Sequence, residues 1–231
     1  MVNTRVGASR IRTEASGTPS IGRREIRKEA TRRQLILAGR RLFSEVGLYE
    51  ARIEDLTEIA GIAKGTMYLY FRNKDELAQA VVAAGYRDLR ARVEECASGA
   101  HSFPVVVRRI VRAHAEFFAR NPDLMRIFHQ GRGMLKFDRP QWRGLRAPLR
   151  DHIAFLAETL RRASSGPRRS DTARRSMALA LFGCVSGVAS VQTALEPHKV
   201  ARAFERALVS NLSSLAYIWP RTSSGKHGRT R

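Results

Sequence analysis

Apolar side chains recur at intervals of three and four positions along most of this chain, the spacing that one buried face of a helix requires. The first such pattern runs from Leu35 to Val46 and stops at Gly47, a residue type that commonly ends helices. A short second helix is predicted over 53–60, before Gly61, and a third over 64–71. Asn73 then stands where it can cap a longer helix that begins at Lys74.

The same spacing continues toward the C-terminus, where breaks that contain proline or glycine separate the apolar stretches. Further helices are predicted near 104–120, 122–131, 141–163, 168–196 and 198–218. No credible pair of strands and no internal repeat is visible. We therefore expect an all-α fold with a small N-terminal three-helix domain and a larger C-terminal helical domain.

The composition is that of an ordinary globular protein except for its charge. Of 231 residues, 43% are hydrophobic and 27% charged, but the net charge is +21, which favours a polyanionic partner such as nucleic acid. Cys96 and Cys184 cannot form a disulfide framework and suit a reducing compartment. The charged N-terminus has no apolar stretch of the kind found in secretory signals, so we expect a cytoplasmic protein.

The positive charge is unevenly distributed. Residues 1–33 hold nine basic and three acidic side chains, and 221–231 hold four basic and no acidic ones. We expect 1–28 to be a flexible basic arm and 221–231 a disordered basic tail, flanking one domain over 29–77 and another over 78–220. Residues 34–77, by contrast, have six basic and seven acidic side chains, a net charge of −1.

The second and third predicted helices, joined by a turn at Gly61-Ile62-Ala63, have the arrangement of a helix-turn-helix, whose second helix enters the major groove of DNA. Glycine suits this turn because it tolerates a positive φ. Apolar residues of the two helices can close a small core with the first helix. The outward positions of the third helix would be a cation, a small residue, a hydroxyl and two phenols: Lys64, Gly65, Thr66, Tyr68 and Tyr70.

The run from Ala60 to Leu77, AGIAKGTMYLYFRNKDEL, together with Leu42-Phe43 and Gly47-Leu48-Tyr49, resembles the TetR-type (tetracycline repressor) family of bacterial transcriptional regulators. The resemblance implies a homodimer with a DNA-binding domain and a ligand-sensing domain. It implies that Tyr68, Tyr70 and Lys74 hold the DNA backbone, and that Lys64 and Thr66 lie where bases are read.

Three positions depart from the family pattern. Arg52 and Ala63 stand where a Thr and a Ser commonly cap the second and third helices, and Thr57 replaces a small alanine at the crossing of the two helices. Losing a cap costs about 1 kcal/mol of helix stability. Arg52 is expected to replace a hydrogen bond to phosphate with a charge contact.

The arm offers cations that residues 34–77 lack. We hypothesise that it contacts the DNA backbone or an adjacent minor groove through Arg23, Arg24, Arg27, Lys28 and Arg32. The alternative is that these arginines reflect compositional bias or aid solubility.

The resemblance implies that the last two helices form the dimer interface. The residues involved are small or apolar and recur at helical spacing: Gly183, Gly187, Ser190, Val191, Phe204, Leu208 and Leu212. Packing of these stripes within one monomer is the alternative. Two reading helices related by a two-fold axis would match a pseudo-palindromic operator on double-stranded DNA.

A sensing pocket would be mostly apolar, and the bulky candidates in the larger domain are Met125, Phe128, His129, Trp142, Phe155 and Phe182. Five arginines lie in the same region: Arg108, Arg109, Arg112, Arg126 and Arg132. We therefore expect a small lipophilic effector, with an anion such as an acyl thioester as one candidate. No cofactor is expected, and the six histidines show no metal-ligand spacing.

Two other functions, and a membrane helix in the larger domain, remain as alternatives. The net charge would also suit a nucleoid-type DNA binder of low specificity that has no ligand. An enzyme in the larger domain is disfavoured because no glycine-rich phosphate loop or nucleophile elbow is visible. The uncharged stretch 176–195 approaches the length of a membrane helix, but its serines, glycines and threonine favour a helix packed between other helices.

Overall fold

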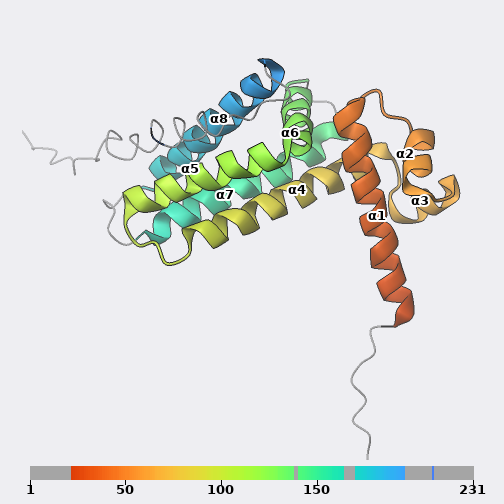
Figure 1. Cartoon of the computed structure of the whole chain (residues 1–231), viewed down its shortest axis with the longest axis horizontal. Helices are drawn as coiled ribbons and strands as arrows, with labels where there is room; N and C mark the ends of the chain where they lie inside the picture. The colour runs from red at the N-terminus through yellow and green to blue at the C-terminus, as the bar shows by residue number, and fades with distance from the viewer. Residues whose placement is uncertain (1–21, 138–139, 164–169, 196–209, 211–231) are drawn as a thin grey trace, which may run out of the picture.

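The computed structural model describes residues 22–137, 140–163, 170–195 and 210, and these residues contain helices and no strand (Figure 1). The expected all-α fold is confirmed. The elements are α1 (Arg23–Glu45), α2 (Ile53–Ala60), α3 (Lys64–Tyr70), α4 (Lys74–Ala97), α5 (Phe103–Arg120), α6 (Pro122–Leu135), the 3-10 helix η1 (Pro140–Leu145), α7 (Arg146–Arg162) and α8 (Asp171–Leu195).

The helices form two groups, which we call the head (α1–α3) and the body (α4–α8). In the body α4, α5 and α7 run along the long axis of the molecule, α8 packs against α5 and α7, and α6 stands between this bundle and α1 (Figure 1). One continuous apolar core extends from the head into the body. The head is therefore docked on the body rather than tethered to it.

Local signals placed the turns of the head correctly. Gly61 ends α2 with a φ of +62°, and Gly47 follows α1 with a φ of +96°. The Asn73 side chain accepts a hydrogen bond from the Glu76 backbone N–H at 2.9 Å and caps α4, as predicted. Arg52 and Ala63 make no side-chain cap hydrogen bond to α2 and α3, in keeping with the departures noted in the sequence.

Four helix boundaries differ from the prediction, and one of them is the end of α6, which lies at Leu135 rather than 131. Helix α1 begins at Arg23, so the last part of the expected flexible arm is helical: the segment has no apolar period but is rich in Arg, Lys, Glu and Ala, which are strong helix formers. The predicted helix 141–163 is divided into η1 and α7, and the C-terminal helix of the body starts at Asp171 rather than 168. The predicted helix 198–218 lies outside the described residues.

Helix α8 buries one side against α5, α6 and α7 and leaves the other open, rather than being enclosed by helices as expected. Among the described residues, α8 is the helix that is long and apolar enough to cross a membrane. Its most apolar 18-residue window has a mean hydropathy of 1.7, and 28% of that window is buried. Its open side carries Leu179, Gly183, Gly187, Val191 and Leu195 at intervals of four. An added Cβ at either glycine would meet no atom within 4 Å, so this side is free to approach another helix closely.

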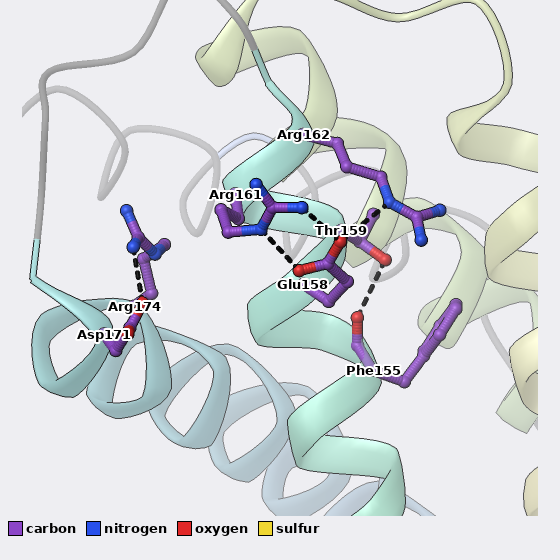
Figure 2. A network of polar contacts seen from close by, with 7 residues as sticks. All are labelled: Phe155, Glu158, Thr159, Arg161, Arg162, Asp171 and Arg174. Carbon is purple, nitrogen blue, oxygen red and sulfur yellow. Dashed lines mark hydrogen bonds and ion pairs between the residues drawn. The ribbon is translucent and has the colours of Figure 1, made fainter.

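Charged surface residues at the junction of α7 and α8 are largely paired with each other (Figure 2). Glu158 accepts hydrogen bonds from Arg161 at 2.6 and 2.7 Å and from Arg162 at 3.0 Å, and Arg174 pairs with Asp171 at 2.5 Å. The Arg161 hydrogen bond, opposed by slight burial and aided by Arg162, lowers the pKa of Glu158 to about 2. Much of the charge on this part of the body is thus neutralised locally.

Candidate nucleic-acid interface

Helix α3 is anchored in the head by a few side chains. Met67 is fully buried, Phe71 directly after the helix is 2% exposed, and Tyr70 packs partly against the core. The remaining positions face outward: Lys64, Gly65 and Tyr68 are exposed and Thr66 is partly so. Of the two tyrosines, Tyr68 is therefore the one available to a ligand, at 46% exposure, whereas Tyr70 is half packed.

Two large apolar side chains on this surface were not singled out from the sequence. Leu69 on α3 is 82% exposed and Tyr49, in the turn between α1 and α2, is 67% exposed. Ile59, expected in the small core, is 36% exposed because it lies on the outer side of α2. The exposure of Leu69 could have been predicted, because it stands in the middle of a run of five large apolar side chains, Met67 to Phe71, and α3 can bury only one face.

The cations of the candidate surface already have partners within the protein. The Lys64 ammonium pairs with Glu54, which raises the pKa of Lys64 and lowers that of Glu54 through their hydrogen bond. Lys74 Nζ donates to the backbone carbonyls of Tyr49 at 2.6 Å and Ala51 at 2.8 Å. An ammonium has three donors, so one N–H of Lys74 is left for another acceptor.

The head and body are joined by polar contacts centred on α6. Arg40 of α1 donates through Nη2 to Asp123 Oδ1 at 2.9 Å and to Asn121 Oδ1 at 3.0 Å, and its Nε also pairs with Asp123. Gln130 Oε1 accepts a hydrogen bond from the Leu48 backbone N–H at 3.0 Å. Any displacement of α6 would therefore strain or break its hydrogen bonds to α1 and to the turn that precedes α2.

The six candidate pocket residues are divided among three places. Phe128, Phe155 and Phe182 join one aromatic cluster in the body, with Tyr86, His114 and His152 as its other members. Met125 and His129 instead line a cavity of about 250 Å³ between α6 and α8. Trp142 is buried in η1, where it belongs to the general core.

The histidines of this aromatic cluster are held in defined tautomers. His114 Nδ1 lies 2.7 Å from the Ile110 carbonyl oxygen, so this nitrogen must carry the proton. Burial lowers the pKa of His114 to about 4 and that of His152 well below its ordinary value, so both rings are neutral. His114 Nε2 then accepts from His152 Nε2 at 3.0 Å. His152 Nδ1 is left as a buried acceptor that no described residue satisfies, which costs about 1–3 kcal/mol.

A partly buried cation adjoins the same cluster. The Arg132 guanidinium lies 5.7 Å from the Phe182 ring centroid and donates to Ser186 Oγ at 2.6 Å, and no described carboxylate pairs with it. Burial lowers the pKa of Arg132, and burial likewise raises that of the neighbouring Tyr86. The sequence had pointed to Arg132, one of the arginines near the candidate pocket. It did not single out Tyr86, His114 and His152 as pocket residues, because the four residues lie on four different helices and no local pattern connects them.

Comparison with known proteins shows which proteins the N-terminal part of the chain is similar to. Residues 35–81 match the model of the bacterial regulatory proteins of the tetR family. The chain is 29% identical over 103 residues to the HTH-type transcriptional regulator UidR of Escherichia coli K12, an alignment that covers 45% of this chain and 53% of UidR. The chain thus spans about half the length of the curated relatives it matches first.

Solved structures extend the likeness to the body. The fatty acid degradation regulator FadR of Bacillus halodurans superposes with a TM-score of 0.66, at 18% identity, over 80% of this chain and 94% of that one. FadR of Bacillus subtilis in complex with stearoyl-CoA superposes with a TM-score of 0.65, at 16% identity, over 79% and 97% of the two chains. At these identities the likeness shows a common fold.

Proposed function

We propose that this chain is a ligand-responsive transcriptional regulator, most simply a repressor. Residues 35–81, which match the model of the bacterial regulatory proteins of the tetR family, support this proposal. The protein would act in the cytoplasm as a homodimer on a pseudo-palindromic operator. The observation that carries this proposal is α3, which is held by the buried Met67 while Lys64, Gly65, Thr66 and Tyr68 stay available to a duplex.

Each side chain would have a role that follows from its placement. Tyr68 and Lys74 would donate to phosphates, Lys74 through the N–H that the Tyr49 and Ala51 carbonyls leave over. Lys64 and Thr66 would reach base edges, Lys64 after exchanging Glu54 for a base acceptor. Tyr70, half packed, could reach DNA through its hydroxyl alone, and Arg52 would make a charge contact.

The test is a comparison of duplexes. We expect the protein to bind the region upstream of its own gene about 10³-fold more tightly than random DNA at ~0.15 M salt. Lys64→Ala should change which operator variants are preferred, whereas Arg150→Ala, at an exposed position of α7 in the body, should change nothing. Equal affinity for both duplexes would instead favour the nucleoid-type binder, and unchanged preference in Lys64→Ala would remove Lys64 from base reading.

The open side of α8 supports the proposed homodimer. Its stripe, in which Gly183 and Gly187 lie between Leu179 and Val191, would pack against the same stripe of a second copy; Ser190 lies at its edge and bonds His129 instead. Phe204, Leu208 and Leu212 lie outside the described residues. Light scattering should give the mass of two chains, and Val191→Glu should give that of one, with Thr172→Glu as an exposed control on the same helix.

The aromatic cluster supports an effector that is apolar with an anionic group. Arg132 offers a charge without a described carboxylate, and His152 Nδ1 offers an acceptor for a donor on the ligand. The adjoining cavity, lined by Tyr86, Phe128 and Arg132 among others, is only about 10 Å³, so such a ligand must push the surrounding helices apart. Because α6 is one of them and holds α1, binding would disturb the head.

Thermal shift with long-chain fatty acids, acyl-CoAs and fatty alcohols would test this effector class. Acids or thioesters should stabilise the protein and weaken its operator binding, and Arg132→Gln should abolish the response. Arg126→Gln is the matched control, since it lines the separate cavity between α6 and α8. A response lost only in Arg126→Gln would place the effector there instead. Steady turnover of any such compound, lost when His129 or Cys184 is replaced, would point to an enzyme.

A further inference from the structure

The N-terminal half of α1 projects beyond α2 and α3 (Figure 1). Residues 23–30 are all exposed. At about 100° per residue, the four basic side chains of residues 23–30 fall within about 140° of the helix circumference, and the two acids fall outside this arc. The arc carries Arg23, Arg24, Arg27 and Lys28 and the other side carries Glu25 and Glu29; farther along α1, Arg32 lies next to the arc and Arg33 on the side of the acids. The segment is thus a helix with one basic face, not merely a basic stretch.

The rest of the head has few free cations. Five of its six cations between residues 34 and 77 are paired within the protein: Arg40 with Asp123, Arg41 with Glu45, Lys64 with Glu54, Arg72 with Glu76, and Lys74 with two backbone carbonyls. Only Arg52 has no side-chain hydrogen bond or ion pair to a described residue. Affinity for a duplex depends on neutralising phosphates and releasing their counterions. Residues 34–77 therefore offer few unpaired cations that could neutralise phosphates.

The projecting face has what the rest of the head lacks. The side chains of Arg23, Arg24, Arg27 and Lys28 make no hydrogen bond or ion pair to any residue the structure describes. At 1.5 Å per residue they and Arg32 extend along about 14 Å, a length over which a duplex presents about eight phosphates. Arg23, Arg24, Arg27 and Lys28 can therefore bind a partner without breaking a hydrogen bond or ion pair to any described residue.

The position of the face points to the same duplex that α3 would contact. The Arg32 guanidinium lies 5.4 Å from the Phe71 ring centroid, and Phe71 directly follows α3. The basic face therefore begins beside the end of α3 and runs outward from it. DNA that lies on α3 would pass its sugar-phosphate backbone along this face.

We infer that the basic face of α1, formed by Arg23, Arg24, Arg27 and Lys28, is a second DNA-contact surface that binds the phosphate backbone beside the groove entered by α3. It supplies most of the sequence-independent affinity, and α3 supplies the selection of sequence. This inference rests on the proposed function. It replaces a flexible arm with a rigid helix as the phosphate-binding element.

The experiment measures affinity for an operator duplex against salt concentration, with the full chain. In the test variant Arg23, Arg24, Arg27 and Lys28 are all changed to Gln, which keeps the helix propensity. We expect the slope of log affinity against log salt to fall by about 3 for each bound protomer. Between 0.05 and 0.2 M salt the unchanged protein should then lose about 60-fold more affinity than the variant for each bound protomer.

Matched controls separate a contact from general charge. The control variant removes four exposed cations of the body, Arg87, Arg108, Arg112 and Arg150, and should keep the original slope. Changing Glu25 and Glu29 to Gln, on the opposite face of α1, should also keep it. Deletion of residues 1–21 should leave most of the slope, because the contact lies in the helix. Circular dichroism verifies that each variant is folded.

Each outcome is decisive. An unchanged slope in the test variant, with normal operator binding by the unchanged chain, overturns this inference and leaves the proposed function standing. Equal losses in the test and control variants also overturn it, since net charge would then explain them, and so does a slope lost only on deletion of 1–21. If the unchanged chain binds no duplex at all, the proposed function fails and this inference with it.

Discussion

Tyr68 of the head and Tyr86 of the body are both helical tyrosines, yet the first is 46% exposed and the second 2% exposed. Tyr68 stands on a surface whose cations form pairs that water and other ions can exchange. Tyr86 stacks on Phe128 with ring centroids 4.2 Å apart, beside two neutral histidines and a partly buried arginine. The head holds its polar groups where a partner can compete for them. The body encloses them, so a ligand must open the structure to reach them.

The largest effect should come from truncating the buried tyrosine of the body, compared with the same truncation of the exposed tyrosine of the head. Tyr86→Ala removes a buried ring and should cost about 3–5 kcal/mol of unfolding free energy, lowering Tm by roughly 10 °C. Tyr68→Ala should leave Tm within about 2 °C and weaken duplex binding. Calorimetry and fluorescence anisotropy on both variants measure the two effects. A large loss of stability in Tyr68→Ala would mean that α3 is packed rather than presented.

The next largest effect should be a fall in the free energy of unfolding at acidic pH, caused by the two buried histidines of the body. His114 and His152 have lowered pKa values when folded and 6.5 when unfolded, so below pH 6.5 the unfolded chain binds more protons. The stability that the protein has with both histidines neutral is complete above pH 6.5 and is lost as the pH falls toward 4. Unfolding free energy should drop by about 1.4 kcal/mol per pH unit for each histidine.

Urea unfolding at pH 7.5, 6.5 and 5.5 tests this dependence in the range where carboxylates contribute little. His129→Gln, at an exposed histidine of α6, should retain the full slope. A double variant with His114 and His152 replaced by Gln should flatten it. Equal slopes in the unchanged protein and the double variant would contradict the assignment to the buried pair.

The smallest effect should come from the charge network at the α7–α8 junction (Figure 2). Glu158 has a pKa of about 2, so its ion pairs with Arg161 and Arg162 contribute stability above pH 4.5 that is lost as the pH falls toward 2. All three groups are near the surface, where solvent screens them. Glu158→Gln should therefore change Tm at pH 7 by no more than about 2 °C. A larger fall in Tm would show that these surface ion pairs stabilise the protein as strongly as buried contacts of the body do.

The amino-acid sequence by itself determined the helical class, the turns and the presentation of α3. Gly61 ends α2, Asn73 caps α4, and Met67 and Phe71 point into the core, because these features depend on residues a few positions apart. The family resemblance came from the same short range, since the run from Ala60 to Leu77 is one continuous stretch.

What only the tertiary structure decided is how side chains distant in sequence neutralise one another. Lys64 meets Glu54 across the turn, Lys74 reaches the carbonyls of Tyr49 and Ala51, and His114 bonds to His152 from 38 positions away. Helical periodicity shows which side of a helix is buried but not which residue of another helix it meets. The start of α1 at Arg23 was missed for another reason: a projecting helix with no apolar face leaves no hydrophobic pattern to find, although its residues are strong helix formers.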